Sequence, residues 1–380
     1  MTYPSRALIS RSAFANNLGE VRSVTADAAI AAGRPAPGVM AIVKADAYGH
    51  GRDIVARWAV EEGADYLGVA QVTEAVELRE TIGPEPRIFS WIYSPGTVAP
   101  ALAADIEISV GAAWALEEVA EAARAAGITA RVHLKVNTGM ARGGLELREL
   151  PEVARRAARL EADGAIVVVG LWSHLARADE PTCGETERQI SLFEGARHEV
   201  RAAGLKVEVH HLAASSGILW HPAAHYDLVR PGIVLYGLSP EPAVATAREL
   251  GLRAVMQLEA DLIVERDVPA GTGVSYGHTE RVDDDAHLAV VPLGYGDGIP
   301  RAASGLGPVM AGGVLGRVIG RVCMDQFVTA TPAHTGDTAV LFGDAAAGLP
   351  TADDWAQLTG TIGYEIVTRI GTRVPRIPVD

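Results

Sequence analysis

The sequence predicts a two-domain α/β protein, with an N-terminal (β/α)8 barrel of the TIM type followed by a mainly β C-terminal domain. Strand-like and helix-like segments alternate about eight times over the first part of the chain, which is typical of a parallel barrel. Beyond Ser239-Pro240-Glu241-Pro242, β-branched runs alternate with glycine and proline turns instead. We therefore expect a barrel domain over residues 1–240 and a mainly β domain over residues 241–380.

The individual elements are expected from the spacing of apolar residues. In the first domain, strands are expected at residues 6–10, 39–44, 66–70, 87–92, 106–110, 130–136, 165–172, 207–213 and 232–237. Helices are expected at 12–24, 52–62, 72–81, 112–126, 149–162 and 186–203. In the second domain, strands are expected at 257–265, 287–292, 314–320, 326–330 and 338–342, and one helix at 351–359.

An open, doubly wound parallel sheet is the main alternative to the barrel, because it also alternates strands with helices. No Gly-x-Gly-x-x-Gly sequence follows the first strand, so a dinucleotide-binding fold of that type is disfavoured.

Composition restricts the partners of this protein. The formal net charge of -14 over 380 residues argues against non-specific binding to nucleic acid or to anionic membranes. No window approaches the ~20 apolar residues of a membrane span, and the N-terminus lacks the apolar core of a signal peptide. The two cysteines, Cys183 and Cys323, lie in unlike contexts and suggest no disulfide framework. We therefore expect a cytoplasmic protein with no nucleic-acid or membrane partner.

Lys44 ends a short apolar run that is typical of a buried strand. Burying an ammonium group is costly unless it is paired or neutralised, and many enzymes make such an amine a Schiff base. The chain has only three lysines, at 44, 135 and 206, and uses arginine for its other positive charges. We interpret Lys44 as an amine that loses a proton and attacks a carbonyl, which an arginine cannot do. A solvent-reaching lysine at a strand end is the alternative, and Lys206, which starts a strand, is expected to be structural.

Other unusual side chains follow predicted strands, at the carboxyl ends where barrel enzymes carry their functional groups. Each has an ordinary explanation of its own, such as a core histidine, a surface ion pair or a helix cap. Their shared position at one rim of the barrel is what favours a functional site. The residues are Lys135, Arg142, His174, Ser215 and Arg230.

A hydroxyl group beside glycine N–H groups, at the end of a late barrel strand, is what a phosphate needs. Ser215 and Gly217 supply such a pair. With an amine nearby, the set suggests pyridoxal phosphate. The residues by themselves thus lead to a barrel enzyme with a lysine-bound phosphorylated cofactor and no metal.

The segment Val43-Lys44-Ala45-Asp46-Ala47-Tyr48-Gly49-His50-Gly51 closely resembles a motif of the alanine racemase family, which uses pyridoxal phosphate on a barrel fold. The similarity continues in order through both predicted domains. It includes Lys135-Val136-Asn137-Thr138-Gly139-Met140-Ala141-Arg142, Ser173-His174, Val229-Arg230-Pro231-Gly232-Ile233, Val274-Ser275-Tyr276-Gly277, Gly320-Arg321-Val322-Cys323-Met324-Asp325-Gln326 and Thr361-Ile362-Gly363-Tyr364-Glu365.

The resemblance implies a two-base reaction that interconverts L-alanine and D-alanine. Lys44 would hold the cofactor and act as the base on one face of the substrate. Tyr276, from the second domain of a partner subunit, would act on the opposite face, so the active unit would be a homodimer with shared active sites. Arg230 would hydrogen-bond the pyridine nitrogen, and His174 would link Tyr276 to Arg230.

The resemblance also implies how the cofactor phosphate is bound. Ser215, Gly232, Ile233 and Tyr364 would surround the phosphate, with Tyr48 alongside.

Three further residues take roles near the substrate by the same resemblance. Arg142 would orient the cofactor and the substrate, and the backbone N–H of Met324, from the partner subunit, would bind the substrate carboxylate. Lys135 matches a family lysine that is often carbamylated, and the resulting anion would pair with Arg142.

This sequence departs from the family pattern at three positions near these residues. Ala214 and Gly363 stand where asparagine is usual or frequent, and Asn137 stands where aspartate is usual. We expect Gly363 to loosen the phosphate loop, since glycine is flexible. Ala214 and Asn137 motivate an alternative function, a racemase of broader or different amino-acid preference. A related amino-acid decarboxylase and a non-catalytic pyridoxal-phosphate carrier are further alternatives.

Overall fold

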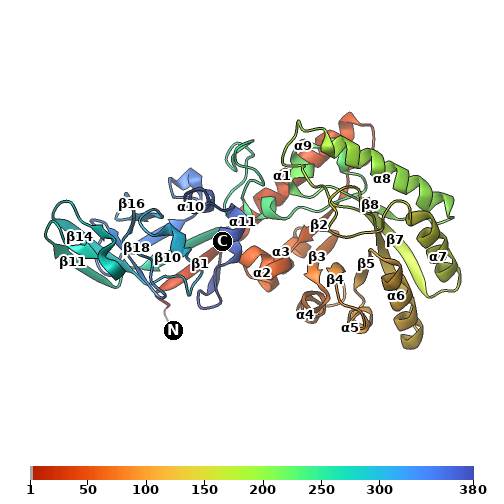
Figure 1. Cartoon of the computed structure of the whole chain (residues 1–380), viewed down its shortest axis with the longest axis horizontal. Helices are drawn as coiled ribbons and strands as arrows, with labels where there is room; N and C mark the ends of the chain where they lie inside the picture. The colour runs from red at the N-terminus through yellow and green to blue at the C-terminus, as the bar shows by residue number, and fades with distance from the viewer. Residues whose placement is uncertain (1–2) are drawn as a thin grey trace. The chain divides into compact units, whose positions relative to one another are not determined.

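The computed structural model describes residues 3–380, and Figure 1 shows the course of the chain. The chain divides into two compact units. The barrel unit comprises Gly19–Ala47 and Val55–Gly232. The β unit comprises the described residues up to Leu18, together with Tyr48–Ile54 and Ile233–Asp380.

Eight parallel strands form the sheet of the barrel unit, in the order β8-β7-β6-β5-β4-β3-β2-β9. The two edge strands are joined where the Arg230 N–H donates to the Ala213 carbonyl over 2.9 Å, so the sheet curls into a barrel. The strands are almost wholly buried, as expected for a parallel sheet covered on both faces. Their bounds are β2 (Gly38–Ile42), β3 (Tyr66–Gln71), β4 (Arg87–Ile92), β5 (Glu107–Val110), β6 (Ala130–Lys135), β7 (Ile166–Trp172), β8 (Val209–His211) and β9 (Leu228–Val229).

Helices alternate with these strands along the chain (Figure 1). The helix α6 (Ala113–Ala126) shows the sequence logic, because Leu116 and Val119 bury one face and Gly127 ends the helix in the left-handed conformation with a φ of 66°. The others are α1 (Arg11–Ala31), α3 (Arg52–Glu61), α4 (Val72–Ile82), α5 (Ala99–Ala103), α7 (Leu150–Ala162), α8 (Glu185–Ala202) and α9 (Ser215–Trp220); α1 and α3 contain residues of both units.

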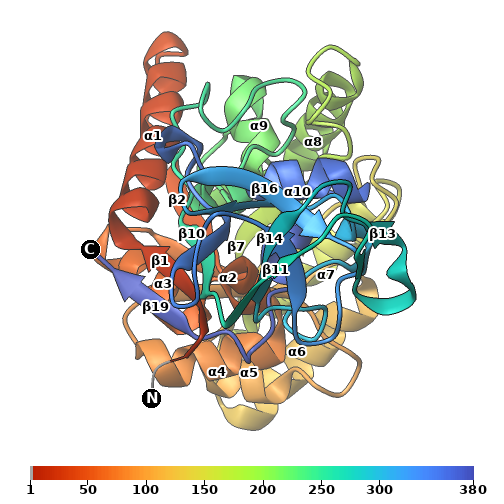
Figure 2. The same ribbon diagram turned by 90° about the vertical axis from the view of Figure 1, so that its left-hand side faces the viewer.

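A nine-stranded sheet dominates the β unit, in the order β11-β14-β17-β16-β15-β18-β10-β1-β19. The N-terminal strand β1 pairs antiparallel with β10 and parallel with the C-terminal strand β19, which lies beside it in Figure 2. Two short helices, α10 (Ala352–Thr359) and α11 (Gly363–Thr368), follow the strand β18. The strands are β1 (Ser5–Ser10), β10 (Met256–Asp261), β11 (Val264–Val268), β14 (Ala286–Val291), β15 (Pro308–Ala311), β16 (Val314–Ile319), β17 (Phe327–Ala330), β18 (Thr338–Phe342) and β19 (Arg376–Val379), with a separate hairpin of β12 (Gly273–Val274) and β13 (Glu280–Arg281).

The predicted fold class, a TIM-type barrel followed by a mainly β domain, is confirmed, and three details differ. Residues 232–237 were expected to be a strand, but Ile233–Tyr236 form a 3-10 helix, and the last barrel strand is β9. The spacing of apolar residues cannot distinguish a strand from a 3-10 helix here, because all four residues of the helix are buried. The strand before Lys44 ends earlier than expected, at Ile42. The expected boundary at residue 240 also differs from the division into units, since β1 belongs to the sheet of the β unit.

Within residues 3–380, none of the helices combines the length and the apolar character that a crossing of the bilayer requires.

Candidate active site

Lys44 starts a left-handed helical turn, α2 (Lys44–Gly49), directly after the barrel strand β2. Ala45, Asp46 and Ala47 have φ values of 52°, 54° and 52°. Such a run is rare for residues other than glycine, because the left-handed helix brings Cβ too close to the following carbonyl oxygen. Strained backbone of this kind persists only where the surroundings hold it, and it is common at functional sites.

Glu74, in the first turn of α4, holds the start of this turn. One carboxylate oxygen accepts a hydrogen bond from the Ala45 N–H over 2.7 Å. The other accepts from the N–H groups of Ala70 and Gln71, at the end of β3, over 3.1 and 2.9 Å. The carboxylate therefore connects the backbone beside Lys44 to the neighbouring strand of the barrel.

The surroundings of Lys44 favour its neutral amine form. Burial lowers the pKa of Lys44, the nearby positive charges of Arg142 and Arg230 lower it further, and Glu74 opposes them. The ammonium group lies 5.9 Å from the ring centre of Trp91. A lysine whose pKa is lowered by burial and by other cations is an activated nucleophile.

Arg230 follows β9 and is 4% exposed. Its guanidinium donates to the carbonyls of Ser173 and Leu212 over 2.9 and 3.0 Å, and to Nδ1 of His174 over 3.2 Å. Burial lowers the pKa of Arg230 to about 9, which leaves the group charged at neutral pH. His174 was expected to link Arg230 to Tyr276, and the contact between Arg230 and His174 agrees with the first part of that expectation.

A chain of buried hydrogen bonds leads from Arg230 into the barrel. Arg230 donates to Nδ1 of His211 (3.1 Å), Nε2 of His211 lies 2.9 Å from Nδ1 of His133, and Nε2 of His133 lies 2.7 Å from a carboxylate oxygen of Glu107. Because Arg230 can only donate and a carboxylate can only accept, each imidazole must carry its proton on Nε2. Neither these two histidines nor Glu107 was predicted from the sequence to belong to the site.

Gly170 makes room for this chain, because a Cβ atom at that position would overlap with the ring of His133. The sequence did contain a signal for this chain, because His133 and Glu107 lie within otherwise apolar strands. Polar side chains that are buried in this way need hydrogen-bond partners.

Trp172 forms a surface against which the cations of the site pack. The Lys135 ammonium lies 4.4 Å from its ring centre, and the Arg230 guanidinium carbon lies 5.1 Å from it. The indole N–H donates to Ser109 Oγ over 3.0 Å, which fixes the ring.

Positive charge is concentrated at this end of the barrel unit. Burial lowers the pKa of Lys135 to about 8, with Arg142 and Arg230 acting in the same direction. The pKa of His174 is held well below its usual value, first by burial and then by Arg230, Arg142, Lys44 and Lys135. Such a cluster is suited to an anionic ligand, because an added negative charge would relieve the mutual repulsion of the cations.

Ser215 and Gly232, two of the residues expected to bind the phosphate, contact each other. The Gly232 N–H donates to Ser215 Oγ over 3.0 Å, and Ser215 is the first residue of α9. Ala214 occupies the N-cap of this helix and has no side chain with which to cap it.

Asn137, one of the departures from the family pattern, has a local structural role. Its carbonyl oxygen accepts from the N–H groups of Gly139 and Ala141, both over 3.1 Å, and its NH2 group donates to Glu146 over 2.8 Å. An aspartate could not make the last bond and would repel Glu146. The amide therefore fits this loop of the chain.

The remaining predicted residues belong to the β unit and form two groups. Tyr48 and Tyr364 lie with their ring centres 6.2 Å apart, and Tyr48 also contacts Tyr236 at 4.8 Å. Ile233, at the start of the 3-10 helix, is 1% exposed.

Tyr276 and Met324 belong to the second group and are 71% and 54% exposed. The residue before Tyr276, Ser275, donates from Oγ to the Arg321 carbonyl over 2.8 Å and lies 3.4 Å from the Sγ of Cys323. The two loops that carry Tyr276 and Met324 are therefore bonded to each other.

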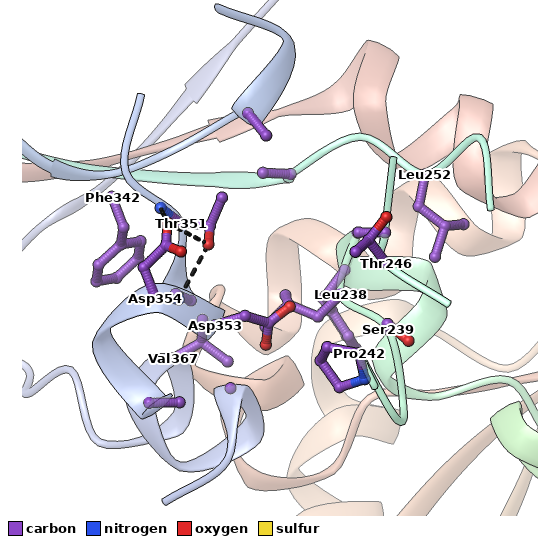
Figure 3. A pocket seen from close by; sticks show the side chains of 18 of the residues that line it. Leu238, Ser239, Pro242, Thr246, Leu252, Phe342, Thr351, Asp353, Asp354 and Val367 are labelled. Atoms are coloured by element: carbon purple, nitrogen blue, oxygen red, sulfur yellow. Dashed lines mark hydrogen bonds between the residues drawn. The ribbon is translucent and has the colours of Figure 1, made fainter. Parts of the chain in front are cut away.

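A cavity of about 930 Å³ lies within the β unit, between the segment that carries Leu238 and the helices α10 and α11 (Figure 3). Asp353 points into it, and burial together with the charges of Asp354 and Glu241 raises the pKa of Asp353 to about 6. A Cβ atom at Gly363 would overlap with Oδ1 of Asp353 and with Cδ2 of Leu238. A larger residue at this position would therefore require both side chains to shift.

Comparison with known proteins assigns the family. A model of the alanine racemase N-terminal domain matches residues 9–240, and a model of the C-terminal domain matches residues 255–378. The chain belongs to the alanine racemase family. The resemblance seen in the sequence is thereby confirmed, as is the expectation of an enzyme of this family.

Relatives match over nearly the whole length of the chain. The alanine racemase of Beutenbergia cavernae is 52% identical over 384 residues, covering 100% of this chain and 99% of the relative. The crystal structure of alanine racemase from the D-cycloserine-producing Streptomyces lavendulae is 44% identical, with a TM-score of 0.95, and covers 100% of this chain and 98% of that one. An alanine racemase structure from Bartonella henselae with covalently bound pyridoxal phosphate is 25% identical, with a TM-score of 0.85, and covers both chains completely.

Proposed function

We propose that this protein interconverts L-alanine and D-alanine, with pyridoxal phosphate as its cofactor and Lys44 and Tyr276 as the two bases. The observation that carries the proposal is the setting of Lys44, a lysine of lowered pKa among Arg142, Arg230 and Lys135 at the carboxyl end of the barrel strands. The bound cofactor of the Bartonella henselae relative supports the choice of cofactor.

The residues of the barrel unit suit this cofactor. When bound, pyridoxal phosphate withdraws electrons from the α-carbon and makes the α-hydrogen acidic. Lys44 would hold the aldehyde carbon. Ser215 and Gly232 would hold the phosphate, and the roles expected for Ile233, Tyr364 and Tyr48 beside it stay predictions. Arg230 would donate to the pyridine nitrogen and, because it stays charged, would not pass a proton to the ring.

Two bases on opposite faces account for racemisation, because one removes the α-hydrogen while the other returns a proton to the opposite face. Lys44 suits the first role, since burial and nearby cations favour its neutral amine. We assign the second role to Tyr276 of a partner subunit, and the exposure of its ring supports this assignment. His174, which is bonded to Arg230, would orient the Tyr276 hydroxyl.

Two further residues would position the substrate carboxylate. Arg142 supplies positive charge near Lys44. The N–H of Met324, from the partner subunit, would donate to the carboxylate. A C2 homodimer would form two such sites by one repeated contact. A cytoplasmic location, expected from the sequence, stays a prediction.

We also propose that Lys135 carries a carbamate, formed when its neutral amine attacks CO2 and releases a proton. Its pKa of about 8 gives a substantial neutral fraction, and the resulting anion would lie among Arg142 and Arg230. Mass spectrometry of the native protein in bicarbonate would show the added mass of one CO2, and Lys135→Ala would remove it. An unchanged mass in bicarbonate would reject the carbamate.

Racemisation assays on alanine, serine, lysine and arginine, with cofactor absorbance followed in parallel, test the main proposal. Alanine is expected to react fastest, and alanine ranking low would favour a racemase of different preference. Lys44→Ala should remove the absorption band of the lysine-bound cofactor, while Lys206→Ala, at an exposed lysine, serves as the matched control. Tyr276→Phe should retain the cofactor and lose exchange of the α-hydrogen with solvent deuterium. Near-normal racemisation by Tyr276→Phe would displace Tyr276 from its role.

A further inference from the structure

Three metal-ligating side chains converge on the β unit, at one edge of its nine-stranded sheet. Donor atoms of Glu265, His287 and His334 all lie within 4.8 Å of one another. None of these residues belongs to the proposed active site. We refer to these three residues as the His287 cluster.

Strand register places two members of the cluster on the same face. His287 on β14 pairs with Asp267 on β11, and Glu265 precedes Asp267 by two residues on the same strand. Because side chains alternate along a strand, Glu265 and Asp267 project from one face of the sheet. Asp267 accepts from Nδ1 of His287 over 2.7 Å, which fixes the ring orientation.

The loop that carries His334 is held to β14 and to the residue Leu262, which lies just before β11. The Thr331 N–H donates to the His287 carbonyl over 3.2 Å, and the Gly336 N–H donates to the Leu262 carbonyl over 2.8 Å. The His334 N–H donates to Asp337 over 2.8 Å. The backbone of all three cluster members is therefore set in place by the sheet and its connections.

The side chains leave a nitrogen of His287 for a ligand. Nδ1 is engaged by Asp267, and the buried Nε2 makes no hydrogen bond of good geometry. His334 Nδ1 lies 3.3 Å from Oε2 of Glu265, and this oxygen also accepts from the Thr335 N–H. The ring also makes a backbone hydrogen bond with Ala333, which a bound ion would replace.

We propose that Glu265, His287 and His334 form a binding site for a divalent transition-metal ion of the zinc type. Two imidazoles and one carboxylate are a donor set that Zn²⁺ prefers, whereas Mg²⁺ and Ca²⁺ prefer oxygen ligands. Asp267 serves as the outer carboxylate that orients a ligating histidine. The charges of Glu265 and Asp267 balance those of the ion.

The present spacing allows the site to close without moving the backbone. Ligand atoms around tetrahedral zinc lie about 3.4 Å apart, from bond lengths of about 2.0–2.1 Å. His334 Nδ1 and Glu265 Oε2 are already 3.3 Å apart, and the other donor atoms, which lie within 4.8 Å of one another, need to approach by up to about 1.4 Å through side-chain rotation. The side chain of His334 is 71% exposed, so it is free to turn and the ion reaches the site from solvent. The bound ion would connect β11, β14 and the loop after β17.

Zinc titration of the cofactor-loaded enzyme, without a polyhistidine tag and after removal of metals by a chelator, tests the site. Calorimetry is expected to show one Zn²⁺ per chain, and zinc is expected to raise the midpoint of thermal unfolding. His287→Ala and His334→Ala should both lose these effects while keeping racemase activity. His198→Ala, at an exposed histidine on α8, is the matched control and should bind as the wild type does.

Two further measurements complete the test. Asp267→Asn keeps the three ligands and should weaken zinc binding by about 10- to 100-fold, as expected for an orienting carboxylate. Excess Mg²⁺ should not compete. Equal zinc affinity in the wild type and in His334→Ala, whose change lies in an exposed loop, would overturn the proposal. A wild type without zinc binding would also overturn it, and neither result would touch the proposed racemase function.

Discussion

The Nδ1 atom of His133 and the Nε2 atom of His211 lie 2.9 Å apart inside the barrel, and this contact joins Arg230 to Glu107. Glu107 is fully buried, and its other oxygen accepts from Arg87 (2.6 Å) and Arg131 (3.1 Å). The interior of the barrel is therefore crossed by a polar chain with the Arg230 cation at one end and the Glu107 carboxylate at the other.

Glu107→Gln is expected to lower the free energy of unfolding by about 3 kcal/mol, because it leaves Arg87 and Arg131 without their shared buried anion. Chemical denaturation at neutral pH measures this loss. Glu117→Gln, which breaks a partly exposed pair with Arg156, is the matched control and should cost less than about 1 kcal/mol. Equal losses in both variants would contradict a special role for the buried carboxylate.

The same variant has a characteristic pH dependence. Burial alone would raise the pKa of Glu107, but His133 and Arg87 outweigh it and hold the pKa at about 2. A pKa below the ordinary 4.5 means that the ionised form adds stability above pH 4.5, and that this stability is lost as the pH falls toward 2. The wild type should therefore lose stability over this range more steeply than Glu107→Gln.

The architecture followed from the sequence more fully than the site did. Apolar runs located the barrel strands, because strands buried on both faces of a parallel sheet are apolar throughout. The strand prediction at 232–237 was wrong for the same reason, because Ile233–Tyr236 form a buried 3-10 helix that is as apolar as a buried strand. The chain from Arg230 to Glu107 could not be assembled from sequence, because its partners are up to 78 residues apart and meet only when the barrel closes.

The departures from the family pattern involve contacts that only the folded chain makes. Glycine at 363 suggested a flexible phosphate loop, and the structure adds that a Cβ atom there would require the side chains of Asp353 and Leu238 to shift. Asn137 suggested altered substrate preference, yet it is matched locally by Glu146. Such pairings join residues whose contact no spacing rule predicts.

Ala45→Gly is expected to stabilise the protein, since Ala45 has a φ of 52° in a left-handed turn and is exposed. Left-handed helical backbone costs an alanine roughly 1–2 kcal/mol, most of which glycine avoids. The same change in the right-handed helix α6, Ala122→Gly, should destabilise by about 1 kcal/mol. Thermal unfolding of the two variants should shift in opposite directions, and shifts of the same sign would contradict the left-handed turn.

Asp353→Asn is expected to change how stability depends on pH. The pKa of Asp353 is raised from 3.8 to about 6, so the folded protein holds this proton more tightly than the unfolded chain does. This contribution to stability is complete below pH 3.8 and disappears as the pH rises through 6, with a total of up to ~3 kcal/mol. Asp353→Asn should therefore be more stable than the wild type at pH 7–8. A wild-type slope retained by the variant between pH 4 and 6 would assign the effect to another group.

Gly363→Ala is expected to lower the free energy of unfolding by about 1–2 kcal/mol, because the added Cβ would overlap with Oδ1 of Asp353 and Cδ2 of Leu238. The overlap is with side chains, so removing Asp353 should restore part of the loss. A double-mutant cycle of Gly363→Ala with Asp353→Ala measures this coupling by denaturation at one pH, and it should exceed about 0.5 kcal/mol. Gly195→Ala, on the exposed face of α8 where a Cβ meets nothing, should be neutral or stabilising. Additive effects of the two changes would mean that contact with Asp353 is not the reason for a glycine at position 363. The flexibility of glycine would then remain as the explanation for this residue.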